Sequence, residues 1–155
     1  MPSVSQAKNI MRRTISEIVD PGLTRREKNE IWSHFESSCA FCGEHIERAS
    51  RTGHIDHLES SGGNGPRNRV LACARCNGDE KRERDWREFL GEKCDDPAVL
   101  EHRRALIKAW VDTHPERHRP ESPAVEQALR DAEQLVEDFH AACTRLREAL
   151  KSDSM

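Results

Sequence analysis

The sequence predicts an α+β protein that is mostly helical, with a single pair of short strands near the middle of the chain. Two Cys-x-x-Cys turns, Cys39/Cys42 and Cys73/Cys76, bracket a strand-like segment. Helix-capping and helix-breaking residues divide the chain before the first of these turns. A heptad pattern of apolar residues fills the last stretch of the chain. At 155 residues there is room for one ordinary domain with appendages.

The N-terminal arm, residues 1–38, is predicted to form two helices. The first runs from about residue 5 to 19 and ends where Asp20-Pro21-Gly22 breaks the pattern. Thr24 and Glu27 then have the spacing of a capping box, in which the hydroxyl and the carboxylate satisfy free backbone N–H groups reciprocally. We therefore expect a second helix that leads into the first cysteine turn.

The residues Cys39, Cys42, Cys73 and Cys76 predict a closed structural zinc site. Each Cys-x-x-Cys presents two sulfurs on one tight turn, and the two turns together supply the four thiolates of a tetrahedral Zn²⁺ ion. Aromatic residues make up only 5% of the chain and tyrosine is absent, so the core has few large side chains. Zinc is therefore expected to stabilise much of the middle of the chain, because metal binding and folding are coupled in small sites.

The cysteines also bear on the compartment in which the protein works. Thiolates held by zinc fit a reducing interior, so we expect a cytoplasmic protein. No apolar run is long enough to cross a bilayer and no signal peptide is recognisable, so no membrane contact is expected.

Between and after the cysteine turns, the sequence predicts a β-hairpin followed by a helix. Residues 52–58 and 69–72 suit two strands, and the glycine-rich residues 59–67 suit the turn that joins them. The glycine-rich segment lacks the Lys-Ser/Thr ending of a P-loop, so we read it as a hairpin turn. From residue 77 to 90 the charges and the apolar spacing indicate one amphipathic helix.

The remainder of the chain is predicted to be helical. The segment 94–120 holds a helix over about 98–112 and then a linker. The segment 121–155 starts with Ser122 and Pro123, which are favoured at the N-cap and in the first turn of a helix. The apolar residues of this last helix alternate steps of four and three, which is a heptad seam. They are Val125, Leu129, Ala132, Val136, Phe139, Cys143, Leu146 and Leu150.

The heptad seam over residues 123–150 allows two arrangements. It can pair with its copy in a homodimer or bind a partner protein, or it can fold back on the 98–112 helix and the N-terminal arm. Ala132 and Cys143 weaken the seam as an isolated coiled coil. We favour the homodimer by a small margin.

Several motifs follow one another in the middle of the chain. They are Cys39-Ala-Phe-Cys42, Asp56-His57-Leu58, Gly62-Gly63, and Asn68 to Asn77 including the second cysteine turn, with Lys81 shortly after. In order, spacing and residue type they resemble the His-Asn-His (HNH) family of metal-dependent nucleases, in the subgroup with a four-cysteine zinc site. The resemblance implies a ββα-metal, treble-clef-like module over residues 39–93. The chain has Glu59-Ser60 where the family often has a proline.

The resemblance also implies a reaction, the hydrolysis of phosphodiester bonds in double-stranded DNA. His57 would be the general base, since a histidine is largely neutral at cellular pH. Asp56 and Asn77 would bind one Mg²⁺ or Mn²⁺ ion, which prefers oxygen ligands. Asn68 would hold the hairpin loop and orient His57. The cation would also bind the departing 3′ oxygen, so no separate general acid is required.

Strand geometry constrains these assignments. Alternation along a regular strand puts His54 and Asp56 on one face and His57 on the other. A distortion or a strand end is therefore expected at the Asp56–His57 pair. His54 has three readings, as an additional metal ligand, a phosphate contact or an ordinary strand residue.

The charge of the chain limits how it can bind DNA. A net charge of −3 argues against binding through bulk electrostatics alone. Local basic clusters beside a nuclease centre can still contact phosphates. Lys81, Arg82 and Arg84 follow the second cysteine turn and are the candidates for gripping the DNA backbone.

Two alternatives to a self-sufficient endonuclease stay open at this stage. The first is a non-catalytic zinc module that binds nucleic acid or protein. Such a module has no reason to keep Asp56, His57, Asn68 and Asn77 at these spacings, which favours the nuclease. The second is a partner-dependent defence or toxin subunit, and the sequence does not choose between phage, restriction and mobile-element roles.

Overall fold

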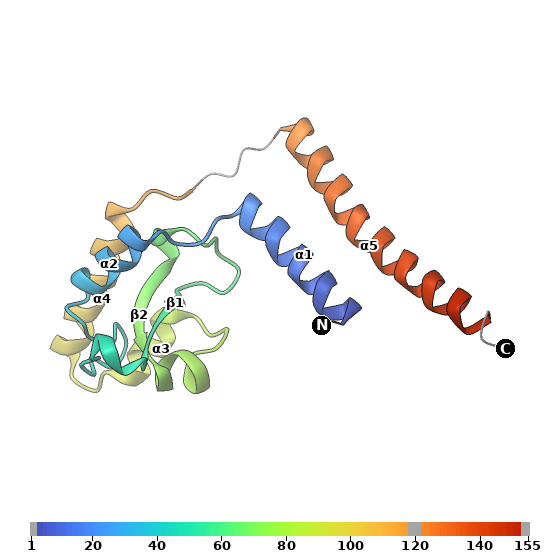
Figure 1. The fold of residues 1–155 in the computed structure, drawn as a ribbon. Coiled ribbons are helices and arrows are strands. Elements are labelled where there is room, and N and C mark those ends of the chain that lie inside the picture. Colours follow the sequence, from blue (N-terminus) through green and yellow to red (C-terminus); the bar gives the residue numbers. More distant parts are fainter. Residues whose placement is uncertain (1–2, 118–121, 153–155) are drawn as a thin grey trace. The chain divides into compact units, whose positions relative to one another are not determined.

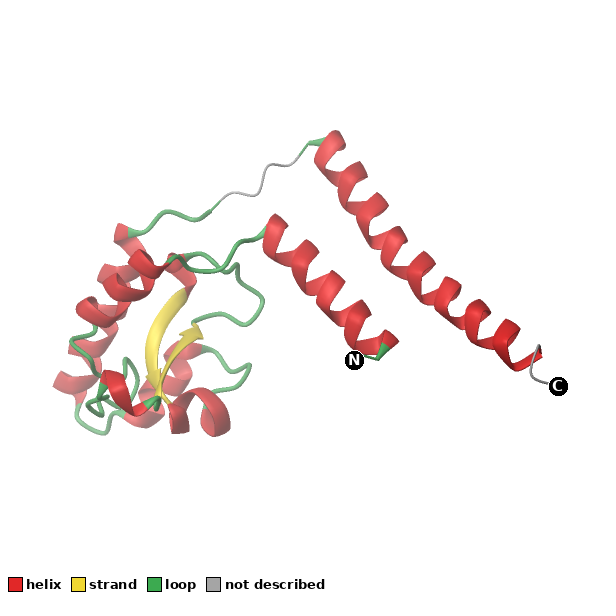
Figure 2. Ribbon diagram, in the orientation of Figure 1, coloured by secondary structure: helices red, strands yellow, loops and turns green. Residues whose placement is uncertain are grey.

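The structure is a computed structural model that describes residues 3–117 and 122–152 (Figure 1). It is α+β and mostly helical, as the sequence predicts (Figure 2). The helices and strands are α1 (Val4–Val19), α2 (Arg25–His34), β1 (Gly53–His57), β2 (Arg69–Cys73), α3 (Trp86–Lys93), α4 (Pro97–Thr113) and α5 (Pro123–Ser152). No helix within the described ranges is both long and apolar enough to cross a membrane.

The chain divides into two compact units. One is formed by its two ends, Met1–Pro21 and His118–Met155, and the other by Gly22–Arg117. We call them the terminal unit and the central unit. The central unit contains both strands, the four paired cysteines and helices α2, α3 and α4.

The two strands form an antiparallel hairpin with a defined register. Gly53 pairs with Cys73 at one end, and His57 pairs with Arg69 at the other. The backbone N–H of Leu58 still donates to the carbonyl of Asn68 at 2.9 Å, but the strand itself ends at His57. The predicted strands agree with these bounds to within one residue, and the predicted strand end falls at the Asp56–His57 pair.

The core of the central unit lies between the hairpin and its helices. Phe41 of the first cysteine turn meets Phe89 of α3 edge to face, with ring centroids 5.2 Å apart. Trp110 of α4 is buried, and its indole N–H donates to the carbonyl of Pro66 at 2.8 Å. Arg67 donates to the carbonyls of Val111 and His114 near the end of α4. Helix α4 therefore anchors the turn that joins the two strands.

The helix predicted over residues 77–90 is wrong as a single element. The structure has one wide turn, Cys76–Glu80, then a break, and then α3. Arg82 has a φ of 49°, which interrupts a right-handed helix. Asp85 then caps α3 by accepting from the backbone N–H groups of Arg87 and Glu88. The apolar spacing alone could not reveal the break, because Trp86, Phe89 and Leu90 all lie after it.

In the terminal unit, α1 and α5 pack against each other. Val136 of the heptad seam is buried, and Leu129 and Phe139 are half-buried. Glu137 of α5 forms ion pairs of 2.7 Å with Lys8 and Arg12 of α1. Over this stretch the seam folds back on the N-terminal arm of its own chain, which is one part of the second arrangement expected. The 98–112 helix, the other part of that expectation, belongs to the central unit. Leu146 and Leu150 stay exposed.

The anchoring role of α4 predicts a large effect for one buried residue. Ile107 is fully buried, so Ile107→Ala leaves a cavity and should lower the free energy of unfolding of the central unit by about 2–5 kcal/mol. The measurement is urea unfolding followed by tryptophan fluorescence. Trp32, Trp86 and Trp110 are the three tryptophans of the chain and all lie in the central unit, so the signal reports on it alone.

The matched control is Val99→Ala on the same helix. Val99 is 40% exposed, so the change should cost about 0.5 kcal/mol or less. Equal unfolding midpoints for the two variants would contradict the packing of α4 against the core.

Candidate active site and zinc centre

The four paired cysteines meet in one place. Their sulfur atoms all lie within 4.8 Å of one another, and none is in a disulfide. Cys39, Cys73 and Cys76 are buried and Cys42 is half-buried. Four convergent sulfurs with little solvent access are the donor set of a structural Zn²⁺ ion, so the residues present fit the metal.

The surroundings of the cysteines favour a thiolate at one position, Cys42. A hydrogen bond from the Cys39 thiol lowers the pKa of Cys42 to about 4, so one thiolate is present at neutral pH. The pKa of Cys39 is correspondingly raised. Arg103 of α4 donates to the Cys39 carbonyl at 3.2 Å, and its guanidinium fills the space beside Gly43, where any side chain would collide. The first turn needs glycine there, since Gly43 has a φ of 72°.

Asp56 and His57 lie at the end of β1, beside Lys81. One carboxylate oxygen of Asp56, Oδ1, accepts from the backbone N–H of His57 at 2.8 Å. The other, Oδ2, is buried without a hydrogen-bond partner and lies 3.5 Å from the ammonium of Lys81. A buried carboxylate oxygen that is left without a hydrogen bond can bind a hard cation, so Asp56 fits the role of a Mg²⁺ or Mn²⁺ ligand.

The ring of His57 is oriented by the hairpin turn. Its Nε2 lies 3.1 Å from Oδ1 of Asn64, and Arg69 donates to the same oxygen. Because an amide oxygen only accepts, the neutral ring carries its proton on Nε2 and keeps a lone pair on Nδ1. Burial, and next the positive charge of Arg69, lower the pKa of His57, which favours this neutral form.

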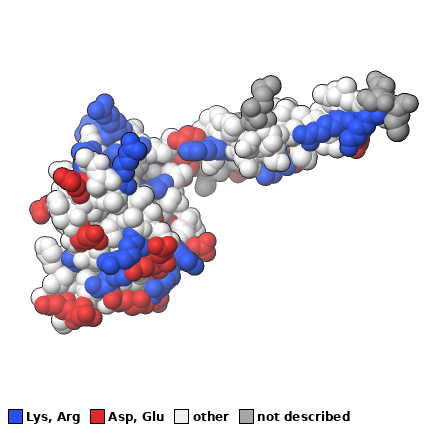
Figure 3. Space-filling view, turned by 60° about the horizontal axis from the view of Figure 1, so that its bottom comes forward, with Lys and Arg blue, Asp and Glu red and all other residues white. Residues whose placement is uncertain are grey.

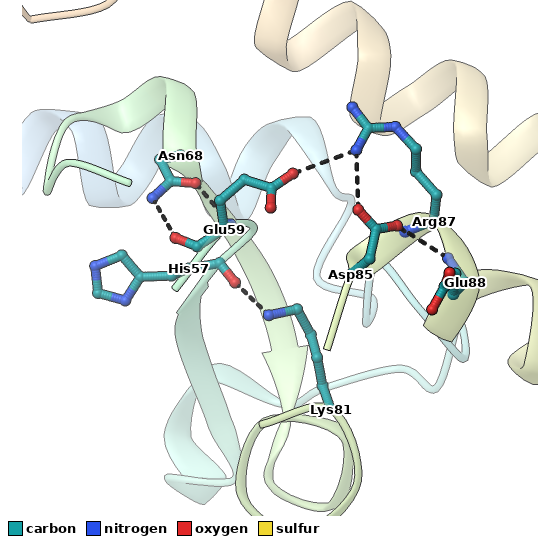
Figure 4. Close-up of polar contacts among 7 residues, drawn as sticks. All are labelled: His57, Glu59, Asn68, Lys81, Asp85, Arg87 and Glu88. Atoms are coloured by element: carbon teal, nitrogen blue, oxygen red, sulfur yellow. Dashed lines mark hydrogen bonds and ion pairs between the residues drawn. The ribbon is translucent and has the colours of Figure 1, made fainter. Parts of the chain in front are cut away.

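Asn68 holds the hairpin turn closed (Figure 4). Its side-chain amide donates to the carbonyls of Glu59 and Gly63, and its oxygen accepts from the backbone N–H of Glu59. These contacts tie Asn68 to both sides of the turn, and its role in orienting His57 stays a prediction. The contact with His57 is made by Asn64, and no sequence pattern indicates this role beyond the place of Asn64 in the glycine-rich segment.

The other two candidate metal ligands are Asn77 and His54. Asn77 is half-buried in the turn Cys76–Glu80, directly after Cys76. His54 is exposed on β1, opposite Ala72. The structure thus brings Asp56, His57 and Lys81 together and leaves His54 facing solvent.

The basic residues expected to grip DNA differ in their surroundings. Lys81 is only 1% exposed, so it has no surface ammonium to offer a phosphate, contrary to the expectation. Arg82 is exposed. Arg84 forms an ion pair with Glu92 and lies over the ring of Phe89. The face shown in Figure 3 carries both basic and acidic side chains, of which the sequence has 25 and 28.

Comparison with known proteins gives one family. Residues 13–99, more than half of the chain, match the family of recombination endonuclease VII. A search of curated proteins finds no match. The matched region contains both strands and all four clustered cysteines.

The cysteine geometry predicts one tightly held zinc ion per chain. Cys73→Ser removes one of four ligands and should abolish zinc retention. Because structural zinc contributes on the order of 10 kcal/mol in small sites, the central unit should unfold with it. Zinc content by elemental analysis and tryptophan fluorescence test this. Cys143→Ser, in the terminal unit, is the control and should keep both; zinc retained by Cys73→Ser would contradict the four-sulfur site.

Proposed function

Because the chain belongs to the recombination endonuclease VII family, whose members are DNA-cleaving nucleases, we propose that it is a metal-dependent DNA endonuclease of the HNH type. The observation that carries the proposal is the pairing of an oriented histidine, whose pKa is lowered, with a half-buried carboxylate at one strand end. His57 and Asp56 are adjacent, and Asp56 has an oxygen free of hydrogen bonds. A purely structural zinc module has no use for this pair.

In the proposed reaction His57 is the general base. The Nε2–H group donates a hydrogen bond to Oδ1 of Asn64, which leaves Nδ1 to take a proton from the attacking water. The lowered pKa keeps the ring neutral at cellular pH, which is the form a base requires. Asn68 keeps the turn that carries Asn64 in place, and so acts on His57 through the loop.

Asp56 and Asn77 are the proposed ligands of the catalytic cation. Two oxygen ligands with waters and phosphate oxygens suit Mg²⁺ or Mn²⁺. When bound, the ion would stabilise the charge that develops on the phosphate and on the departing 3′ oxygen. A zinc ion held by the four cysteines would be structural, since their sulfur atoms would fill all four of its positions. Arg82 and Arg84 are the proposed contacts to the DNA backbone.

The test of the nuclease proposal is cleavage of supercoiled plasmid with Mg²⁺ or Mn²⁺. His57→Ala should lower the cleavage rate by about 100-fold or more, the usual effect of losing a general base. His54→Ala, an exposed histidine on the same strand, should leave the rate close to that of the wild type. The ratio of nicked to linear product reports whether one or both strands are cut.

The opposite result has a clear meaning. If the wild type holds zinc, binds DNA and cuts neither strand with either cation, the non-catalytic zinc module becomes the better description. If His54→Ala is inactive while His57→Ala cleaves like the wild type, the base is assigned to the wrong histidine.

We further propose that the exposed part of α5 pairs with a second copy of the chain in antiparallel orientation. Leu135, Phe139, Ala142, Leu146 and Ala149 follow steps of four and three, and all but the half-buried Phe139 are exposed. This stripe shares the half-buried Phe139 with the part of the seam that α1 covers, and its other members are exposed. A two-helix unit with so little buried apolar surface gains stability by adding further helices.

Charge favours the antiparallel orientation of the two copies. Residues 123–138 contain five acidic side chains and one basic, whereas residues 139–152 contain three basic and one acidic. An antiparallel pair centred on Ala142 brings Glu133 opposite Lys151 and Glu137 opposite Arg147. A parallel pair would set like charges against each other along both halves.

Cross-linking tests both the pairing and its direction. In a Cys143→Ser background, Ala142→Cys should form an interchain disulfide, because the symmetry axis puts position 142 beside itself. Ala149→Cys should not, because the two copies of that residue would lie about 21 Å apart at 1.5 Å per residue. Cross-linking of both variants would mean a parallel pair, and of neither a monomer.

A further inference from the structure

Lys81 is a buried lysine in the central unit. Among the charged side chains of residues 3–117 and 122–152, it is the one that is fully buried, with 1% of its surface exposed. Removing an ammonium group from water costs several kcal/mol unless nearby groups compensate. Its neighbours therefore show what the protein gains from it.

Those neighbours are the two proposed catalytic residues. The ammonium of Lys81 donates to the carbonyl of His57 at 2.7 Å (Figure 4). It lies 3.5 Å from Oδ2 of Asp56, which is close enough for an ion pair but not for a hydrogen bond. The ring of Phe41 faces it at 5.9 Å. The charge of Asp56 is thus balanced while its Oδ2 keeps its lone pairs.

The backbone of Lys81 is fixed to the zinc centre. Its N–H donates to the carbonyl of Cys76 at 3.1 Å, which closes the turn that follows the last cysteine. Its side chain then spans from this turn to the end of β1, 24 residues earlier in the sequence. One residue therefore links a zinc ligand to both members of the Asp56–His57 pair.

We propose that Lys81 is a positioning residue of the active site. This rests on the nuclease function proposed above. The buried ammonium holds the His57 carbonyl and the Asp56 carboxylate in one arrangement, so that Oδ2 of Asp56 is directed toward the catalytic cation and the His57 ring toward Asn64. Lys81 itself touches neither DNA nor the reacting atoms.

The test compares Lys81→Met with Lys108→Met in the full-length, zinc-loaded protein. Methionine matches the length of lysine without its charge, and Lys108 is an exposed lysine on α4 that undergoes the same change. Two quantities are measured. The first is kcat and KM for plasmid cleavage, and the second is Mn²⁺ binding without DNA, from the electron paramagnetic resonance signal of free Mn²⁺.

If Lys81 is a positioning residue, Lys81→Met should change both kcat and Mn²⁺ binding. The kcat should fall by about tenfold to 100-fold with KM unchanged, because misplaced groups slow the chemistry and not DNA binding. Mn²⁺ binding should weaken by about tenfold, as it does when supporting residues of metal ligands are lost. A purely electrostatic effect would do the reverse, since removing a cation beside Asp56 would tighten Mn²⁺ binding. Lys108→Met should change neither quantity.

Mn²⁺ binding that is unchanged or tighter in Lys81→Met overturns the proposal. A higher KM with an unchanged kcat also overturns it, because that result would mean that Lys81 contacts DNA. If Lys81→Met fails to hold zinc, Lys81→Gln takes its place, because its amide keeps a donor for the His57 carbonyl without the charge. A wild type that binds Mn²⁺ in a Lys81-dependent manner without cutting DNA overturns only the nuclease proposal. A wild type that binds no Mn²⁺ overturns both.

Discussion

The convergence of four cysteine sulfurs is the constraint on which the central unit depends. The chain has few large apolar residues, and the two cysteine turns are themselves part of its buried core. The first turn is tied to β2 by a hydrogen bond from the N–H of Ala40 to the carbonyl of Leu71 at 2.8 Å. The second continues directly from β2 and ends in the turn that fixes Lys81. Both strands, and the site at the end of β1, are therefore placed by the same four side chains.

The electrostatics of the site follow from this placement. Asp56 lies between a backbone N–H and a buried ammonium, which together balance its negative charge. Its Oδ2 atom makes no hydrogen bond. His57 lies near two positive charges, Arg69 and Lys81, that oppose its protonation. A carboxylate beside an imidazole whose pKa is lowered is the combination that a cation-assisted hydrolysis needs. Each member of the pair is tuned by residues distant in sequence.

The sequence predicted the elements whose signals are local. The capping box at Thr24, the hairpin strands and the N-cap at Ser122 all appear in the structure, because each depends on residues within a few positions. Contacts across many residues could not be predicted in this way. Lys81 looked like a surface cation, since nothing in its local sequence reveals a bond to His57. Asn64, and not Asn68, contacts the histidine ring because the turn folds back over the strand end.

The packing of α4 against the core of the central unit bears on where the nuclease module ends. The match to the endonuclease family stops at residue 99, shortly after α4 begins. Yet Ile107 and Trp110 belong to the buried core, and the end of α4 holds the hairpin turn through Pro66 and Arg67. A fragment cut at the edge of the family match would lose the support of the loop that carries Asn64. The smallest fragment of this chain that folds and cleaves DNA by itself therefore extends at least to the end of α4. A fusion protein that carries this nuclease module should include all of α4.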